Sequence, residues 1–74
     1  MDENTARRSL GDAIRRRRIE LDFSQDTFAD HIEMHRAYYS AIERGERNVT
    51  LRLLLRVAEG LKLPLATLCK EARL

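Results

Sequence analysis

Arginine supplies most of the chemistry that this sequence offers. Twelve of its fourteen basic residues are arginine rather than lysine. A planar guanidinium can form paired hydrogen bonds with a phosphate or with the edge of a guanine base. The basic residues are concentrated in residues 1–19 and 36–56, whereas residues 20–35 hold five acidic residues and no Lys or Arg. Such segregation suits a polyanionic partner, although solvated helix faces with paired charges would produce a similar pattern.

Histidine and cysteine could bind a metal or act in catalysis, but their spacing favours neither. His31 and His35 lie four residues apart, as in helical metal pairs, yet Ile32 stands where the zinc-protease motif needs glutamate. Cys69 is the only cysteine, and no orienting group or oxyanion site accompanies it. We therefore expect no metal, no other cofactor and no enzyme activity, with Cys69 packed as a small apolar side chain.

The composition indicates one small domain. Of the 74 residues, 43% are hydrophobic and 35% charged, with one proline and three glycines. This balance favours an all-α fold, and so small a core leaves little stability for a large catalytic cleft. No apolar run could cross a bilayer, the first ten residues do not resemble a signal peptide, and a lone cysteine suits a reducing compartment. We expect a cytoplasmic protein with no membrane partner.

Hydrophobic periodicity predicts a compact five-helix domain. We expect a flexible N-terminal arm over residues 1–8 and one domain over residues 9–74. Ser24 and Thr50 are N-cap candidates, Gly45 is a left-handed stop, and Pro64 suits a first turn. The expected helices are Ser9–Leu21, Gln25–Ile32, Arg36–Arg44, Leu51–Leu61 and Leu65–Ala72. Two short helices joined by the break at residues 33–35 form a helix-turn-helix arrangement.

The apolar stripes of these helices define the expected core. Its members are Leu10, Ile14, Leu21, Phe28, Ala29, Ile32, Ile42, Leu51, Leu54, Ala58, Leu61 and Leu68. Leu53, Leu65 and Leu68 could all close this core. We favour the alternative that they form an exposed patch through which two copies of the chain associate as a homodimer.

The third helix leaves one face free. At about 100° per residue, Tyr38, Tyr39 and Ile42 share the side that faces the core. The opposite side carries short side chains and two arginines, namely Arg36, Ala37, Ser40, Ala41 and Arg44. Such a face would let the helix lie close against another surface, with Arg36 projecting from its N-terminal end, as entry into a DNA major groove requires. The alanines could also be present simply as good helix formers.

A longer pattern resembles a known family. The residues from Tyr38 to Asn48, YYSAIERGERN, are its most specific part, and Leu10, Ile14, Ser24-Gln25, Phe28-Ala29 and the leucine-rich residues 51–61 support it. Over residues 10–68 the chain resembles the phage repressor and Cro proteins, the xenobiotic-response-element family of helix-turn-helix regulators. In size and layout it is similar to the controller proteins of restriction–modification systems.

This resemblance implies a role for individual residues. The base-reading positions are Arg36, Ala37, Ser40 and Ala41, and Arg36 would form a bidentate contact to guanine. The phosphate-binding positions are Gln25, Arg44, Arg47 and Asn48. Arg18 and Glu43 match a structural ion pair that joins the first helix to the third. The implied partner is double-stranded DNA, bound as a pseudo-palindromic operator by a homodimer with the third helix in the major groove.

Three residues depart from the family pattern. Glu33 stands in the turn where glycine is usual, and glutamate tolerates a positive φ poorly, so we expect a displaced or strained turn. His35 replaces the usual Ser or Thr cap of the third helix; it caps more weakly but could reach a phosphate instead. Tyr39 replaces an aliphatic residue, and its hydroxyl must find a partner or reach the surface.

The sequence therefore predicts a sequence-specific transcriptional regulator, a repressor or controller. Without a second domain we expect no small-molecule effector. The alternative is an antitoxin or adaptor that uses the same scaffold to hold a protein partner through its last two helices. A neighbouring toxin gene would favour this alternative, and a neighbouring restriction and methyltransferase pair would favour the controller.

Overall fold

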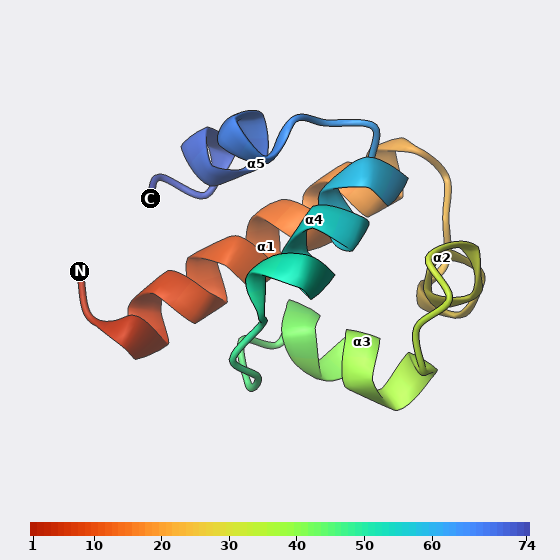
Figure 1. The fold of residues 1–74 in the computed structure, drawn as a ribbon, viewed down its shortest axis with the longest axis horizontal. Helices are drawn as coiled ribbons and strands as arrows, with labels where there is room; N and C mark the ends of the chain where they lie inside the picture. The colour runs from red at the N-terminus through yellow and green to blue at the C-terminus, as the bar shows by residue number, and fades with distance from the viewer.

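Five α-helices and no strand make up the computed structural model, which describes residues 1–74. The helices are α1 (Glu3–Glu20), α2 (Gln25–His31), α3 (Arg36–Glu43), α4 (Leu51–Gly60) and α5 (Leu65–Glu71). In Figure 1, α1 is the long rod that crosses behind α4, with α3 below, α2 at one side and α5 above. The predicted all-α, five-helix fold is confirmed. No helix is long and apolar enough to span a membrane.

The first helix begins six residues earlier than the sequence predicted, so the expectation of an arm over residues 1–8 is wrong for residues 3–8. Asp2 caps α1 by accepting a hydrogen bond from the Thr5 N–H at 2.7 Å. Nη1 of Arg7 lies 2.9 Å from Oε1 of Glu3, and Nε of Arg7 donates to the Gly45 carbonyl at 3.3 Å. Polar contacts hold these first turns, and hydrophobic periodicity does not detect them.

The other helices begin at the predicted residues. Ser24 caps α2 in a reciprocal capping box with Thr27, and Thr50 caps α4 by accepting from the Leu53 N–H at 3.2 Å. His35 caps α3 through its Nδ1, which accepts from the Ala37 N–H at 3.3 Å. Pro64 occupies the N-cap position of α5 rather than its first turn.

A residue in the left-handed backbone conformation follows the end of every helix, and only one of these five residues is glycine. The residues with positive φ are Asp22, Glu33, Gly45, Lys62 and Arg73. At the end of α2 the Met34 N–H bonds to the Ala29 carbonyl at 2.8 Å, which closes the helix in the Schellman manner. The turn between α2 and α3 therefore has regular geometry. It is strained rather than displaced, because Glu33 is held at a φ of 55°.

Most of the residues predicted for the core are buried in the structure. Nine of them are buried, and Leu21 and Leu54 pack against the core while partly exposed. Leu51 is 65% exposed, so its assignment to the core is wrong. It continues the α4 stripe of Leu54, Val57 and Leu61 in sequence, but it is the first residue of α4 and its side chain is open to solvent. Leu68 is fully buried, so the expectation that it contributes to a dimer surface is also wrong.

Gly11 sets how closely α1 approaches α3. A Cβ atom at this position would lie 2.3 Å from the Glu43 carbonyl oxygen and 2.7 Å from that of Ile42. The two helices therefore touch backbone to backbone at the C-terminal end of α3. The sequence pattern does not predict this contact, which fixes the distance between α1 and α3.

We predict that Glu33→Gly raises the free energy of unfolding by about 1 kcal/mol, because glycine adopts a positive φ without steric strain. Chemical denaturation measures the change. Arg15→Gly, on the exposed middle of α1, is the matched control and should lower stability by about 1 kcal/mol. A Glu33→Gly protein no more stable than the parent would show that the turn stores no strain.

Candidate nucleic-acid interface

The outer face of α3 is open to solvent. Arg36, Ala37 and Arg44 are exposed and Ser40 is half-buried. Together with His35 they line one shallow depression. Arg44 is folded along the helix, since its guanidinium donates to Ser40 Oγ at 2.6 Å and lies 3.0 Å from a Glu46 carboxylate oxygen. Four of the five residues predicted for this face therefore lie on an accessible surface.

Ala41, the fifth, is 7% exposed, so its placement on the free face is wrong. The chain after α3 turns back on the last turn of the helix, where the Glu46 N–H bonds to the Ala41 carbonyl at 2.9 Å. The side chain of Ala41 is a single methyl group, which has almost no exposed surface. Ala41 cannot contact a base edge in this conformation.

A buried ion pair holds the inner face of α3. Arg18 donates to both carboxylate oxygens of Glu43, from Nε at 2.7 Å and from Nη2 at 3.1 Å. Its Nη1 donates to the Phe23 carbonyl at 2.8 Å. The side chains of the pair are 9% and 2% exposed, so the resemblance brought together two residues that do meet inside the protein.

Two further side chains hydrogen-bond to the same carboxylate. The Tyr39 hydroxyl donates to Oε2 of Glu43, which gives the buried phenol the partner it requires. Gln25 donates from Nε2 to Oε1 at 2.9 Å. No buried side-chain nitrogen or oxygen is left without a hydrogen bond. The cluster thus connects α1, α2 and α3 through one carboxylate.

These contacts shift the pKa of each titratable member of the cluster. Burial alone would raise the pKa of Glu43, but the hydrogen bonds from Arg18, Tyr39 and Gln25 outweigh it and lower the pKa below its ordinary value. The hydrogen bond to Glu43 raises the pKa of Arg18. Burial, followed by the hydrogen bond to the Glu43 carboxylate, raises the pKa of Tyr39. The cluster is therefore one anion, one cation and a neutral phenol at neutral pH.

Gln25, a residue expected at a phosphate, makes two hydrogen bonds within the protein. While its Nε2 donates to Glu43, its Oε1 accepts from Nη2 of Arg36 at 3.5 Å. Arg36 also forms an ion pair with Asp26, with 2.9 Å between Nε and Oδ1. The first turn of α2 therefore holds the arginine at the start of α3.

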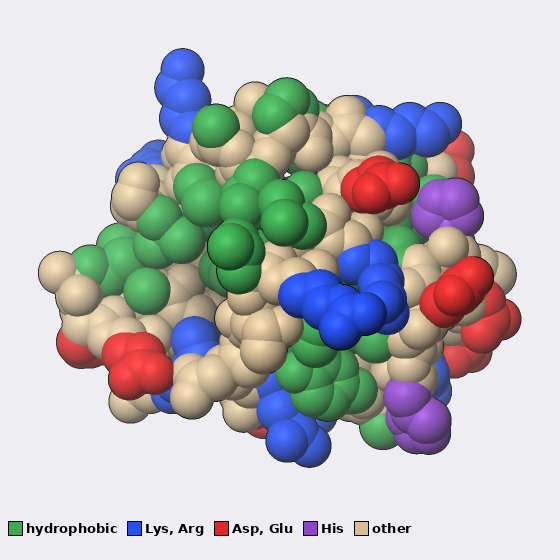
Figure 2. Space-filling view, in the orientation of Figure 1, with side chains coloured by type: hydrophobic (Ala, Val, Ile, Leu, Met, Phe, Trp, Pro, Cys, Tyr) green, Lys and Arg blue, Asp and Glu red, His purple; other side chains and the backbone are tan.

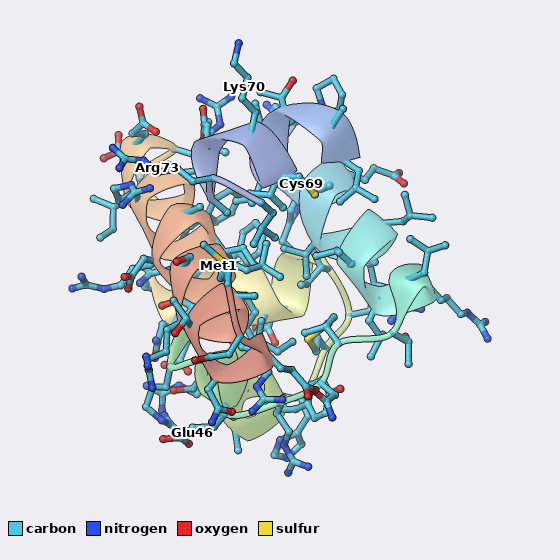
Figure 3. The ribbon with its side chains drawn as sticks, turned by 90° about the vertical axis from the view of Figure 1, so that its left-hand side faces the viewer. Met1, Glu46, Cys69, Lys70 and Arg73 are labelled. Carbon is cyan, nitrogen blue, oxygen red and sulfur yellow. The ribbon has the colours of Figure 1, made fainter.

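The loop after α3 carries the other candidate phosphate ligands. Arg47 and Asn48 are exposed, and the Arg47 guanidinium lies 5.2 Å from the centre of the Tyr38 ring. Asn48 Oδ1 accepts from Nη1 of Arg7 at 2.6 Å, which ties the loop to the first turns of α1. Figure 3 shows Glu46, in this loop, at the opposite end of the molecule from Lys70 in α5.

Tyr38 and Arg7 contribute in ways that the sequence pattern does not predict. Helical spacing predicts Tyr38 on the buried side, but Tyr38 is half-buried and its ring supports Arg47. Arg7 lies in the segment predicted as an arm. Only the spacing of Glu3 and Arg7, four residues apart, signals a helix there.

His31 and Cys69 do not line the depression on α3. His35 lines it and also caps the helix. His31 stacks on Phe23, with ring centres 5.1 Å apart, and Cys69 is half-buried in α5. No group of three or more His, Cys, Asp or Glu side chains is placed to hold a metal ion.

Comparison with known proteins identifies similar regulators. The helix-turn-helix family matches residues 14–68. Control protein C.MunI of Mycoplasma sp is 42% identical over 55 residues, which are 74% of each of the two chains. The clp gene regulator ClgR of C. glutamicum is 29% identical, with a TM-score of 0.88 over 92% of this chain and 87% of its own.

A third similar protein was solved on DNA. The restriction–modification controller protein C.Esp1396I, as a tetramer in complex with its natural 35 base-pair operator, is 27% identical. It matches with a TM-score of 0.79 over 93% of this chain and 96% of its own. The resemblance seen in the sequence is thereby confirmed.

We predict that Glu43→Gln lowers stability at neutral pH by about 3 kcal/mol, because Arg18 then keeps a buried charge without its counter-charge. The variant should also lose less stability on acidification. The native pKa of Glu43 lies below its ordinary value of 4.5. Its contribution is therefore complete above that pH and is lost as the pH falls through the native pKa.

Urea denaturation of both proteins between pH 7 and pH 3 measures this difference. The gap between the two stabilities should narrow below about pH 4.5. A gap that stays constant over this range would show that the Glu43 charge does not stabilise the fold.

Proposed function

Because this chain belongs to the helix-turn-helix family of DNA-binding transcriptional regulators, we propose that it controls a restriction–modification system by binding a pseudo-palindromic operator as a homodimer. The similarity to control protein C.MunI supports the controller role. The operator complex of C.Esp1396I supports the mode of DNA binding. The protein acts by occupying DNA rather than by catalysis.

The observation that carries this proposal is the uncovered outer face of α3. Arg36 and Ala37 are exposed at its N-terminal end, where a recognition helix meets base edges. The short side chain of Ala37 allows a close approach to the groove floor. Arg36 is the main base-reading residue, through a bidentate contact to guanine, and Ser40 lies beside it.

Phosphate contacts flank this face. His35 lies before Arg36, and Arg44, Arg47 and Asn48 follow at the other end of α3, all of them exposed. A groove-bound helix passes between two phosphate backbones, so side chains at both ends can reach one. Contacts of this kind supply affinity that depends strongly on salt but carries no sequence information.

The dimer would form through leucines on α4 and α5. Leu51 and Leu55 are 65% and 49% exposed, and Leu53 and Leu65 are half-buried. Figure 2 shows hydrophobic side chains gathered over this part of the molecule, next to a group of basic side chains. Leu51 and Leu55 thus replace the buried Leu68 in the predicted patch. A twofold axis through it would place two α3 helices on half-sites about one duplex turn apart.

We predict that Arg36→Ala and Arg47→Ala weaken DNA binding in different ways. The probes are a duplex selected from a random library by the parent protein and a scrambled duplex of equal composition. Arg36→Ala should weaken the binding free energy by ~1–3 kcal/mol for the selected duplex alone. Arg47→Ala should weaken binding to both duplexes alike. It should also reduce the slope of log affinity against log salt concentration by about one. Equal losses for Arg36→Ala on the two duplexes would contradict base reading.

We predict that the double variant Leu51→Ser, Leu55→Ser is monomeric where the parent protein is a dimer. Both side chains are exposed, so the change removes apolar surface without opening the core. Sedimentation equilibrium measures the mass. Ile19→Ser, which alters an apolar residue of α1 that is 49% exposed, is the matched control and should stay dimeric.

An unchanged dimer in the double variant would contradict this interface. A parent chain that is monomeric, and that binds a different protein through these leucines, would favour the adaptor function instead.

A further inference from the structure

Arg36 is held in place before any DNA is present. Its Nε lies 2.9 Å from Oδ1 of Asp26, and its Nη2 donates to Oε1 of Gln25 at 3.5 Å. The side chains of Arg36 and Asp26 are 59% and 70% exposed. The pair thus stands on the open surface of α3 rather than within the core.

The two acceptors lie at the capped start of α2. Gln25 and Asp26 are the first two residues of α2, whose capping box fixes the start of the helix. Gln25 is further tied by its hydrogen bond to Glu43, the carboxylate of the buried pair. The position of Arg36 is therefore linked to the core of the protein through the ion pair with Asp26 at 2.9 Å and the longer hydrogen bond to Gln25 at 3.5 Å.

Both contacts lie on the Nε–Nη2 side of the guanidinium, and of the two only the contact from Nη2 to Gln25 is a hydrogen bond. A guanidinium has five N–H groups, one on Nε and two on each terminal nitrogen. The ion pair lies at Nε and the hydrogen bond uses one N–H of Nη2, while Nη1 has no hydrogen bond or ion pair. The free N–H groups of Nη1 and Nη2 form the fork that matches O6 and N7 of guanine.

We propose that Asp26 is a specificity-determining residue that acts by positioning Arg36, an inference that rests on the proposed function. Its carboxylate orients the free fork of the guanidinium. It also offsets the charge of Arg36, so that this arginine gains little from phosphates of arbitrary sequence. Where no guanine meets the fork, DNA brings phosphates close to the Asp26 charge without a compensating contact, and like charges repel. Asp26 therefore lowers affinity for random DNA and raises affinity for the operator.

Asp30 provides a matched control on the same helix. It lies one turn after Asp26, is exposed, and takes part in none of the ion pairs of the structure. Asp26→Asn and Asp30→Asn make the same change of charge in the same helix. Only the first removes the charge that faces Arg36.

The experiment measures the affinities of these variants for the selected and scrambled duplexes at several salt concentrations. Asp26→Asn should bind the scrambled duplex about 3-fold more tightly and the selected duplex about 3-fold more weakly, so that the ratio of the two affinities falls by about 10-fold. Asp30→Asn should leave the ratio within about 2-fold of the parent value. Asp26→Glu, which keeps the carboxylate, should restore most of the ratio. An unchanged ratio in Asp26→Asn would overturn the inference.

An Arg36→Ala background separates this inference from the proposed function. There, Asp26→Asn should no longer change the ratio, because no guanidinium remains to be positioned. A further fall in the ratio would show that Asp26 acts by another route and would overturn the inference. If Arg36→Ala by itself left the ratio unchanged, the base-reading function would fail as well. If it lowered the ratio while Asp26→Asn did not, Arg36 would keep its role and Asp26 would lose its own.

Discussion

The ion pair between Arg18 and Glu43 is the interaction on which the placement of α3 depends. Helices of seven or eight residues do not persist in water unless other parts of the fold hold them. Here one buried carboxylate accepts from Arg18 of α1, Gln25 of α2 and Tyr39 of α3 itself. The contact of Gly11 with the end of α3 sets the distance between the helices. Loss of one charge would leave the other buried alone, which is costly.

This arrangement divides α3 into two sides with different electrostatics. On the inner side, the charges are paired and buried. On the outer side, Arg36 and Arg44 are paired with the exposed carboxylates of Asp26 and Glu46. Exposed pairs of this kind are weak and can be exchanged for contacts with DNA. The molecule can therefore present arginines that are oriented but still available.

The sequence predicted the helices well because local interactions set most of their boundaries. Ser24, Thr50 and Gly45 mark helix ends by mechanisms that need no knowledge of the tertiary fold. The outward placement of Arg36, Ala37 and Arg44 followed from helical spacing alone. The family resemblance brought together Arg18 and Glu43, which spacing could not pair. What was missed depends on tertiary packing, such as the burial of Ala41 and Leu68. The N-terminal turns of α1 were missed because polar contacts, not an apolar stripe, hold them.

Replacement of each guanine of the selected duplex by 7-deazaguanine tests the placement of α3 most directly. The substitution removes N7, an acceptor of the major groove, and leaves base pairing intact. If Arg36 contacts guanine there, one guanine in each half-site should be needed for tight binding by the parent protein, and the Arg36→Ala variant should be indifferent to its replacement. Tight binding to every substituted duplex, or equal sensitivity in the two proteins, would contradict the proposed docking of α3.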